Sequence, residues 1–277
     1  MSLIDTFLFN GEWDMLALRL RTLDEIVDRF VLVESHRAFS GRPRAWAFDN
    51  PPAEFAPWLP RITHVKVTDD PEPGANAWRG HPSRMQSAAL LDHQRDAVAR
   101  GLAGAADDDV VLIADMDEIP DPRGYGRALE LLDAHPFVTN ALGMYCYWLN
   151  ALRSDRGAWA SGVWTRMSTL RQTPAVGIAE VFSRYRARAP AAVAAGWHFT
   201  WQGPLPRIEA RLTDMMERQY DNDEYRRLLR AAYAAGVYCG YPWKPDAPLQ
   251  FQAIDDTFPL PLQRDPQRWA HMIKGVD

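Results

Sequence analysis

The run Asp115-Met116-Asp117-Glu118 places two carboxylates two positions apart, directly after the apolar segment 109–114. In an extended chain alternate side chains point the same way, so Asp115 and Asp117 would face one side. Two carboxylates so placed suit a hard divalent cation, because Mg²⁺ keeps one or two carboxylates and completes its shell with water and phosphate oxygens. The pattern predicts a site for Mg²⁺ or Mn²⁺, which would neutralise charge on a departing diphosphate.

The same four residues also fit two different roles. A strand followed by a solvated acidic loop needs no ligand. Phosphatases of the haloacid dehalogenase type also carry Asp-x-Asp after an apolar strand, and there the first Asp is a nucleophile. Those enzymes usually have the motif on their first strand, whereas Asp115 follows several predicted elements and the run continues Glu118-Ile119-Pro120. The phosphatase is the weaker alternative, and the sequence pattern leaves it open.

The segments before the acidic run predict a parallel sheet. Residues 3–9 are an apolar run that ends at the turn signal Asn10-Gly11. Residues 12–28 repeat apolar side chains at helical spacing, and residues 30–33 read as a buried strand. A strand, a helix and a strand of this length form a βαβ unit. Such units build parallel sheets whose ligands lie outside the carboxyl ends of the strands, which is where the acidic run would lie.

The rest of the chain predicts further helices and strands. They are a strand at 62–67, helices at 84–102 and 125–135, a long strand or hairpin at 137–149, a strand pair around Ser161-Gly162 at 158–167, and helices at 205–220 and 223–235, the last capped by Asp223. The C-terminal end is rich in proline and is expected to wrap over the body. We therefore predict an α/β fold with a mostly parallel central sheet flanked by helices and a helical C-terminal part.

Composition excludes several classes of protein. The 277 residues carry a formal net charge of -5, which argues against a nucleic-acid binder with its usual basic footprint. Cys146 and Cys239 lack zinc-type spacing and are expected to be reduced thiols. No signal peptide and no apolar stretch of transmembrane length occurs, so we expect a cytoplasmic protein, with peripheral membrane contact left open.

Four segments, taken together and in order, carry a resemblance to a known family. They are residues 5–14 (Asp-Thr-Phe-Leu-Phe-Asn-Gly-Glu-Trp-Asp), residues 30–34 with Phe39-Ser40-Gly41-Arg42-Pro43, residues 93–95 (His-Gln-Arg) with 111–120, and residues 196–201 (Gly-Trp-His-Phe-Thr-Trp). The third segment is the most specific of the four. The chain resembles glycosyltransferase family 17, which includes β-1,4-mannosyl-glycoprotein N-acetylglucosaminyltransferase.

The resemblance implies a GT-A-like nucleotide-sugar-binding fold, inversion at the anomeric carbon, a divalent metal and a UDP-sugar donor, with N-acetylglucosamine as the expected sugar. It implies one domain over 1–277, with a donor-binding half at 1–125 and an acceptor-side half and C-terminal wrap at 126–277. The acceptor would be a hydroxyl on a glycan or glycolipid. An inactive sugar-binding module derived from such an enzyme is a further alternative. Relatives often carry His-Gln-Glu after the Gly-Trp-His segment, whereas this chain has Glu217-Arg218-Gln219, so acceptor binding can differ.

Roles follow for individual residues, each with a plainer alternative as a core, capping or ion-paired side chain. The metal ligands are expected to be Asp115, Asp117 and His198, because a neutral imidazole is a good metal ligand. The donor is expected to contact Asn10, Glu34, Arg42, Gln94, Arg95 and Asp115. Here a carboxylate accepts hydrogen bonds from uracil or ribose and a guanidinium pairs with phosphate oxygens. His198 would face away from Trp197 and Phe199 if the segment is extended.

Catalysis and acceptor binding are the least defined parts of the prediction. Asp117 and Glu118 are assigned as catalytic. Acceptor sugars are expected to stack on Trp148 and Trp201, with Trp159 and Trp164 as further candidates. An inverting reaction needs a general base, usually Asp or Glu. Spacing does not identify it, and the candidates are Glu180, Asp155 and Glu209.

Overall fold

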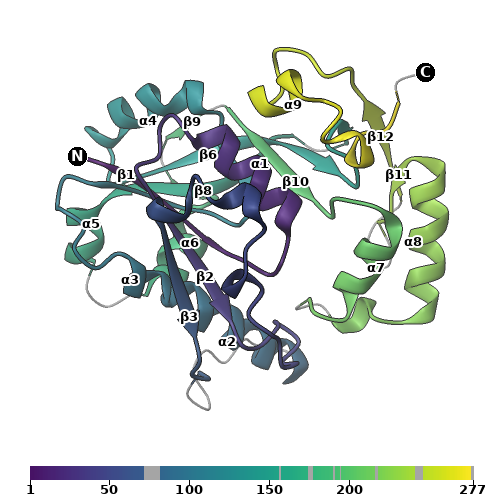
Figure 1. Ribbon diagram of the computed structural model, residues 1–277, viewed down its shortest axis with the longest axis horizontal. Coiled ribbons are helices and arrows are strands. Elements are labelled where there is room, and N and C mark those ends of the chain that lie inside the picture. Colours follow the sequence, from purple (N-terminus) through teal and green to yellow (C-terminus); the bar gives the residue numbers. More distant parts are fainter. Residues whose placement is uncertain are drawn as a thin grey trace.

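The computed structural model describes residues 1–71, 82–155, 157–173, 177–189, 191–193, 195–215, 218–240 and 246–275. A mixed sheet in the order β11-β12-β7-β6-β8-β4-β1-β2-β3 organises them (Figure 1). The four strands at one end are parallel: β1 (Leu3–Leu8), β2 (Arg29–Ser35), β3 (Ile62–Val67) and β4 (Val110–Ile113). The βαβ prediction is confirmed for this part, which brings the ends of β1 and β4 side by side.

Beyond β4 the sheet continues antiparallel, so the sheet as a whole is mixed. The strands are β8 (Trp159–Arg166), β6 (Phe137–Cys146), β7 (Ala151–Arg153), β12 (Ala247–Phe251) and β11 (Val237–Tyr238). Three short strands attach beside this path: β5 (Glu118–Ile119), β9 (Ala192–Val193) and β10 (Trp197–Thr200). Strand β10 lies between β5 and β6, and it thereby carries the Gly-Trp-His segment to the end of the acidic run.

Helices cover both faces of the parallel strands because the side chains of those strands alternate between two cores. Leu3 and Phe7 of β1 pack on one face with α1 (Trp13–Leu23) and α4 (Tyr125–Leu132). Ile4 and Leu8 pack on the other face with α3 (Val98–Gly101) and α6 (Ile178–Tyr185). Strands β1, β2 and β4 are therefore buried on both sides, whereas β3, at the edge of the sheet, is partly exposed.

A third core lies at the other end of the molecule. It joins α7 (Leu205–Leu212) and α8 (Asp223–Ala235) to the end of β6 and to β12, and it includes the buried thiols Cys146 and Cys239. Figure 1 shows α7 and α8 side by side, apart from the helices that cover the parallel strands. No helix in the described part of the chain is long and apolar enough to cross a membrane.

Several predicted elements are shorter than expected. Helix α1 ends at Leu23 rather than at residue 28. The helix predicted at 84–102 divides into α2 (Pro82–Asp96) and α3, and the helix predicted at 205–220 ends as α7 at Leu212. Ala97 interrupts the helix predicted at 84–102, and α3 then brings Gly101 close to β2. A Cβ added at Gly101 would lie 2.3 Å from Val31, so the close approach requires glycine. Residues 216–217 of the helix predicted at 205–220 lie outside the described residues.

Two predictions of local structure were wrong. The pair of strands expected around Ser161-Gly162 is the single strand β8. Gly162, with φ +71°, allows a bulge there instead of a turn, and the pairing of β6 with β8 shifts register at this level. The cap of α8 is Asn222 and not Asp223, because the Asn222 side chain accepts the Tyr225 N–H at 2.8 Å.

Candidate active site

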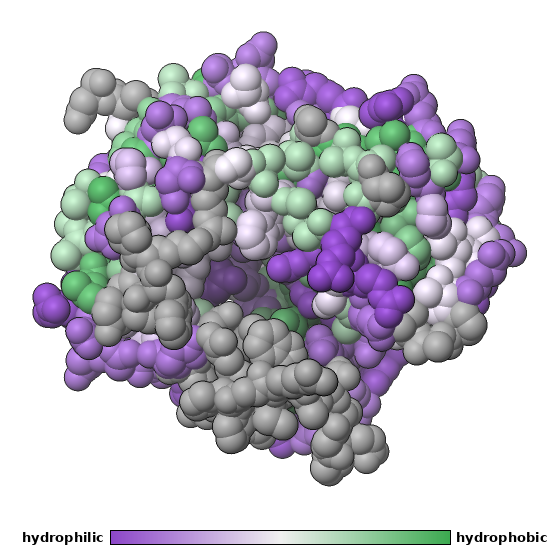
Figure 2. Space-filling view, turned by 180° about the vertical axis from the view of Figure 1, so that it is seen from behind, coloured by the Kyte–Doolittle hydropathy of each residue, from purple (hydrophilic) through white to green (hydrophobic). Residues whose placement is uncertain are grey.

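A cavity of about 480 Å³ lies where β1 and β4 end, facing α2, β10 and α7. Six residues that the sequence singled out line it: Asn10, Arg95, Asp115, Asp117, His198 and Trp201. In Figure 2 the surface is hollowed near its centre, and the floor of that hollow is hydrophilic. The acids of the acidic run thus share one enclosure with residues that lie far from them along the chain.

The acidic run reaches this cavity through a tight turn rather than through an extended chain. The Glu118 N–H donates to the Asp115 carbonyl at 3.0 Å, and the Asp115 N–H donates to the Glu118 carboxylate at 3.1 Å. The expectation of an extended backbone was therefore wrong. The expectation that Asp115 and Asp117 face the same space is confirmed, since both line the cavity.

Asp115 is paired with a cation from α2. Nη2 of Arg95 lies 2.5 Å from Oδ1 of Asp115, and the Arg95 guanidinium also lies 4.2 Å from the centre of the Phe182 ring. Burial pushes the pKa of Asp115 upward, but the charge and hydrogen bond of Arg95 outweigh it and hold that pKa below its usual value. Asp115 is thus an ionised carboxylate at neutral pH.

Asp117 lies close to His198. Burial, reinforced by the nearby carboxylates of Glu118 and Asp115, raises the pKa of Asp117 to about 6, against the opposing charges of His198 and Arg211. Nε2 of His198 lies 3.7 Å from Oδ1 of Asp117, while the other ring nitrogen, Nδ1, is buried without a hydrogen-bond partner among the described residues. As predicted, Trp197 and Phe199 point into the core and His198 faces the opposite way, into the cavity.

The side chains at this site suit a divalent cation only if substrate phosphates and water supply the remaining ligand atoms. In the described ranges no group of three or more His, Cys, Asp or Glu side chains is arranged to hold an ion. Asp117 and His198 are adjacent, and Asp115 belongs to the same turn as Asp117. One or two protein carboxylates are enough for Mg²⁺ when substrate phosphates and water complete the shell.

Glu118 is not among the described residues that line the cavity. It is buried, with 2% of its surface exposed, and its carboxylate accepts the indole N–H of Trp159 at 2.9 Å besides the Asp115 N–H. The Trp159 ring in turn lies 5.2 Å from the His198 ring, centre to centre. Glu118 therefore joins the turn of the acidic run to the surroundings of His198.

Three predicted donor residues also lie outside the described cavity lining. The Glu34 carboxylate accepts the N–H groups of Ala47 and Phe48 at 2.5 and 3.2 Å and contacts Nε2 of His64 at 3.0 Å. Gln94 is buried and donates to the Arg37 carbonyl at 3.0 Å. These contacts hold the segment after β2 in place. Arg42 is mostly exposed, and it faces Asp214 at 3.7 Å.

Of the four tryptophans considered for the acceptor, Trp201 is the one found in the described lining of the cavity. It adopts φ 56°, a left-handed conformation that a bulky side chain rarely takes outside functional sites. Trp148 is buried against Tyr233, with the ring centres 4.2 Å apart, and Trp164 is buried and donates to Asn140. Trp159 is absent from the described lining, and its ring lies beside the His198 ring.

The residues proposed as bases are absent from the described lining of the cavity. Glu180, Asp155 and Glu209 pair instead with Arg184, Arg153 and Arg230. Besides Asp115 and Asp117, the carboxylates in the described lining are Glu12 and Asp214. Glu12 accepts the Asn10 N–H at 2.8 Å, and Asp214 lies just beyond α7.

Sequence reasoning missed three arginines that line the cavity. Arg44 donates to the Asn10 side chain, Arg207 donates to Asp14 at 2.6 Å, and the Arg211 guanidinium lies 5.9 Å from the centre of the Trp201 ring. Arg207 and Arg211 are four positions apart on a predicted helix, so their shared face could have been noticed. Arg44 lies in an irregular segment that gave no such signal.

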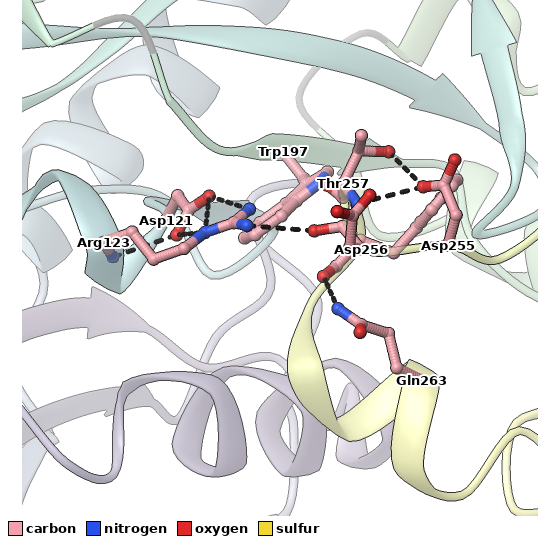
Figure 3. Close-up of polar contacts among 8 residues, drawn as sticks. Asp121, Arg123, Trp197, Asp255, Asp256, Thr257 and Gln263 are labelled. Atoms are coloured by element: carbon pink, nitrogen blue, oxygen red, sulfur yellow. Dashed lines mark hydrogen bonds and ion pairs between the residues drawn. The ribbon is translucent and has the colours of Figure 1, made fainter.

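A second hollow, of about 360 Å³, lies on the opposite face of β10, beside Trp197. Figure 3 shows its polar groups bonded to one another: Arg123 bridges the Asp121 carboxylate and the Asp256 carbonyl, and the Thr257 hydroxyl donates to Asp255. The Trp197 indole donates to the Thr257 carbonyl at 3.2 Å. These contacts fasten the C-terminal segment to the body, so the substrate-sized cavity beside Asp115 is the better candidate site.

Comparison with known proteins identifies the family of this chain. Residues 1–171 match the family model described as glycosyltransferase family 17, a stretch that includes the acidic run and Arg95. No curated protein matches the chain. Among solved structures the crystal structure of S. aureus TarS 1-349 is similar, with 10% identity and a TM-score of 0.42 over 100% of both chains. Because the family match spans more than half of the chain, the protein belongs to glycosyltransferase family 17 and is a glycosyltransferase.

Proposed function

We propose that this cavity binds a UDP-sugar, with N-acetylglucosamine as the sugar, and that an acceptor hydroxyl displaces UDP with inversion on a GT-A-like fold. One observation carries the proposal: Asp115, Asp117 and His198 meet several arginines inside one cavity at the carboxyl ends of parallel strands. A nucleoside diphosphate needs such a mixture, because cations neutralise its phosphates while carboxylates hold its counterion.

A divalent ion, Mn²⁺ or Mg²⁺, would be held by Asp117 and His198, with Asp115 beside them and diphosphate oxygens completing its shell. When bound, it would supply charge neutralisation for the departing UDP. Nε2 is the ring nitrogen of His198 that faces Asp117, at 3.7 Å from Oδ1, so it is the nitrogen assigned to the ion. Asp117 must lose its proton before it can act as a ligand.

The arginines of the cavity would hold the diphosphate by charge-assisted hydrogen bonds. Arg95 is positioned for this by Asp115, and Arg207 by Asp14. Arg211 comes from α7 and extends the positive charge toward Trp201. These side chains come from both halves of the chain, so donor binding would involve residues 1–125 and residues 126–277.

The acceptor side of the reaction is assigned to the region around Trp201. Its ring at the edge of the cavity offers an apolar face for the acceptor sugar of a glycan or glycolipid. The base that deprotonates the acceptor hydroxyl is assigned to Glu12 or Asp214, the remaining carboxylates of the described lining. Replacing the true base, as Glu12→Gln or Asp214→Asn, would abolish transfer while leaving UDP binding intact.

The experiment that tests the proposal is titration calorimetry with UDP and UDP-N-acetylglucosamine, in Mn²⁺ or Mg²⁺ and again in EDTA. Metal-dependent binding in the micromolar range, lost in Asp117→Ala, is the expected result. Asp133→Asn is the matched control, because Asp133 is an exposed acid that pairs with Arg166 outside the cavity. Binding of glycans without any UDP affinity would instead identify an inactive module, and phosphate trapped on Asp115 would identify a phosphatase.

A further inference from the structure

A fully buried arginine lies beneath the acidic run. Arg19 of α1 has no exposed surface, and neither has its partner Asp5 of β1. Nε and Nη2 of Arg19 donate to the two Asp5 oxygens at 2.7 and 2.6 Å. The guanidinium also lies 4.9 Å from the centre of the Phe7 ring. Asp5 thus fixes the plane of the Arg19 guanidinium.

The remaining nitrogen of Arg19 contacts the backbone of the acidic run. Nη1 lies 3.0 Å from the Asp115 carbonyl, 3.2 Å from the Met116 carbonyl and 2.9 Å from the Glu118 carbonyl. A single side chain therefore caps the inner side of the turn that presents Asp115 and Asp117. The Asp115 carbonyl also accepts the Glu118 N–H, and the bonds from Arg19 tie it together with the Met116 and Glu118 carbonyls, which fixes the path of the turn.

Stability alone does not explain a charge pair at this place. A buried ion pair loses the solvation of both charges, and well-packed apolar residues of similar volume often serve a fold equally well. What apolar residues cannot do is donate hydrogen bonds. Only arginine offers five N–H donors in a planar fork, which here reach a carboxylate on one side and three carbonyls on the other.

We propose that Arg19, held by Asp5, is a positioning residue that fixes the turn of residues 115–118 and thereby the two carboxylates that bind donor and metal. Neither Arg19 nor Asp5 is part of the described cavity lining, so their effect is transmitted through the backbone. This inference rests on the proposed function of the cavity for its effect on transfer. The claim that Arg19 fixes the turn of residues 115–118 does not depend on the proposed function.

Two variants separate positioning from charge balance. Arg19→Lys keeps the positive charge beside Asp5 but has too few donors to hold the carboxylate and the turn together. The double variant Asp5→Asn with Arg19→Met removes both charges and leaves no uncompensated ion. Both are expected to fold and to lose about 10- to 100-fold in kcat, because small displacements of positioned groups cost about that much. The KM for the acceptor should change little.

Leu23→Ala is the matched control. Leu23 is buried in the same helix, one turn after Arg19. Its aliphatic side chain cannot donate hydrogen bonds to the carbonyls of residues 115–118. Its loss should lower Tm while kcat, measured well below Tm, stays at the wild-type value. Wild-type kcat in Arg19→Lys and in the double variant would overturn the proposal.

Hydrogen exchange provides a readout that does not depend on activity. In Arg19→Lys the amides of a peptide covering residues 114–120 should exchange at least about tenfold faster than in the wild type, while peptides from β2 and β3 stay unchanged. Unchanged exchange at 114–120 would refute the positioning role even if transfer were never detected. Faster exchange at 114–120 in Arg19→Lys, together with a wild-type protein that binds no UDP-sugar, would leave the positioning role intact and refute the proposed function.

Discussion

Nη2 of Arg95 lies 2.5 Å from Oδ1 of Asp115, so a residue expected to bind the diphosphate and a residue expected to bind the metal form an ion pair with each other. The pair links α2 to the end of β4. It keeps the pKa of Asp115 below its usual value, and both residues line the cavity. Binding of the donor is therefore expected to depend on both residues together.

Arg95→Gln tests this dependence. The variant removes a charged donor from the cavity and leaves the half-buried Asp115 without its counterion, so UDP should bind at least about tenfold more weakly, which corresponds to roughly 1.4 kcal/mol. Calorimetry in Mn²⁺ measures the change. Arg100→Gln is the control, because Arg100 pairs with Asp69 at the exposed surface. Equal UDP affinity in Arg95→Gln and wild type would remove Arg95 from the donor site.

The pH dependence of donor binding follows from Asp117, whose pKa is raised to about 6 by burial. Only the carboxylate form can bind the metal, so metal-dependent UDP affinity should rise as pH increases through about 6 and become constant above about 7. Calorimetry at pH values of about 5, 6 and 7.5 measures this. Asp117→Asn should remove both the affinity and its pH dependence, and a flat profile in the wild type would contradict the assignment.

The raised pKa of Asp117 also makes the stability of the folded protein depend on pH. Because its pKa in the folded protein lies above the ordinary 3.8, the folded state holds the proton more tightly than the unfolded state does. The stability that this proton confers is present at low pH and is lost as pH rises from about 4 to about 6. Addition of Mn²⁺ with UDP should therefore raise Tm more at a pH of about 7.5 than at about 5. A larger increase at the lower pH would contradict this linkage.

Trp201 allows backbone strain and ligand contact to be separated. Trp201→Ala and Trp201→Gly both remove the ring and should raise the acceptor KM by similar factors, of roughly tenfold for one lost sugar-stacking contact. Glycine accepts φ 56° without strain, so Trp201→Gly should be about 1 kcal/mol more stable than Trp201→Ala. Thermal unfolding and acceptor kinetics measure the two effects. An unchanged acceptor KM in both variants would place the acceptor elsewhere.

Glu118→Gln distinguishes a catalytic carboxylate from a structural one. A neutral amide can accept only through its oxygen, so one of the two donors, the Asp115 N–H or the Trp159 indole, loses its partner. The expected cost is about 1–3 kcal/mol, seen as a lower Tm. Transfer below Tm should fall by less than about tenfold, well short of the roughly 10²–10⁴ that a positioned acid or base supplies. A loss of about 10²-fold or more would instead identify Glu118 as a catalytic group.

Much of the site followed from local pattern. The apolar segment before Asp115 predicted a buried strand, and the βαβ spacing predicted that its end lies at the ligand-binding edge, as β4 and β1 show. The alternation of Trp197, His198 and Phe199 predicted which of them faces the cavity. These features depend on periodicity and on the geometry of parallel sheets, which short segments already contain.

Glu34, Gln94 and Glu118 lie outside the described lining of the cavity for a reason that they share. Glu34 and Gln94 have residue types suited to a nucleotide, yet their hydrogen bonds go to the backbone of neighbouring segments. Glu118 stands in the motif itself but bonds back to the turn and to Trp159. Residue type and spacing say what a side chain can do, whereas its actual partner depends on which segments pack beside it.

The parallel strands, the acidic run at the end of β4 and the family of the chain can all be inferred from the order of its residues, because periodic burial and short motifs are local properties. Three relationships became visible in the folded chain alone: Arg207 and Arg211 share the cavity with Asp117, Arg95 pairs with Asp115, and Arg19 with Asp5 contacts the turn from beneath. The hydrogen bonds of Arg19 alone join residues that are 14 to 99 positions apart. Such pairings are set by the order of the strands and by the packing of helices on the sheet, which no local pattern contains.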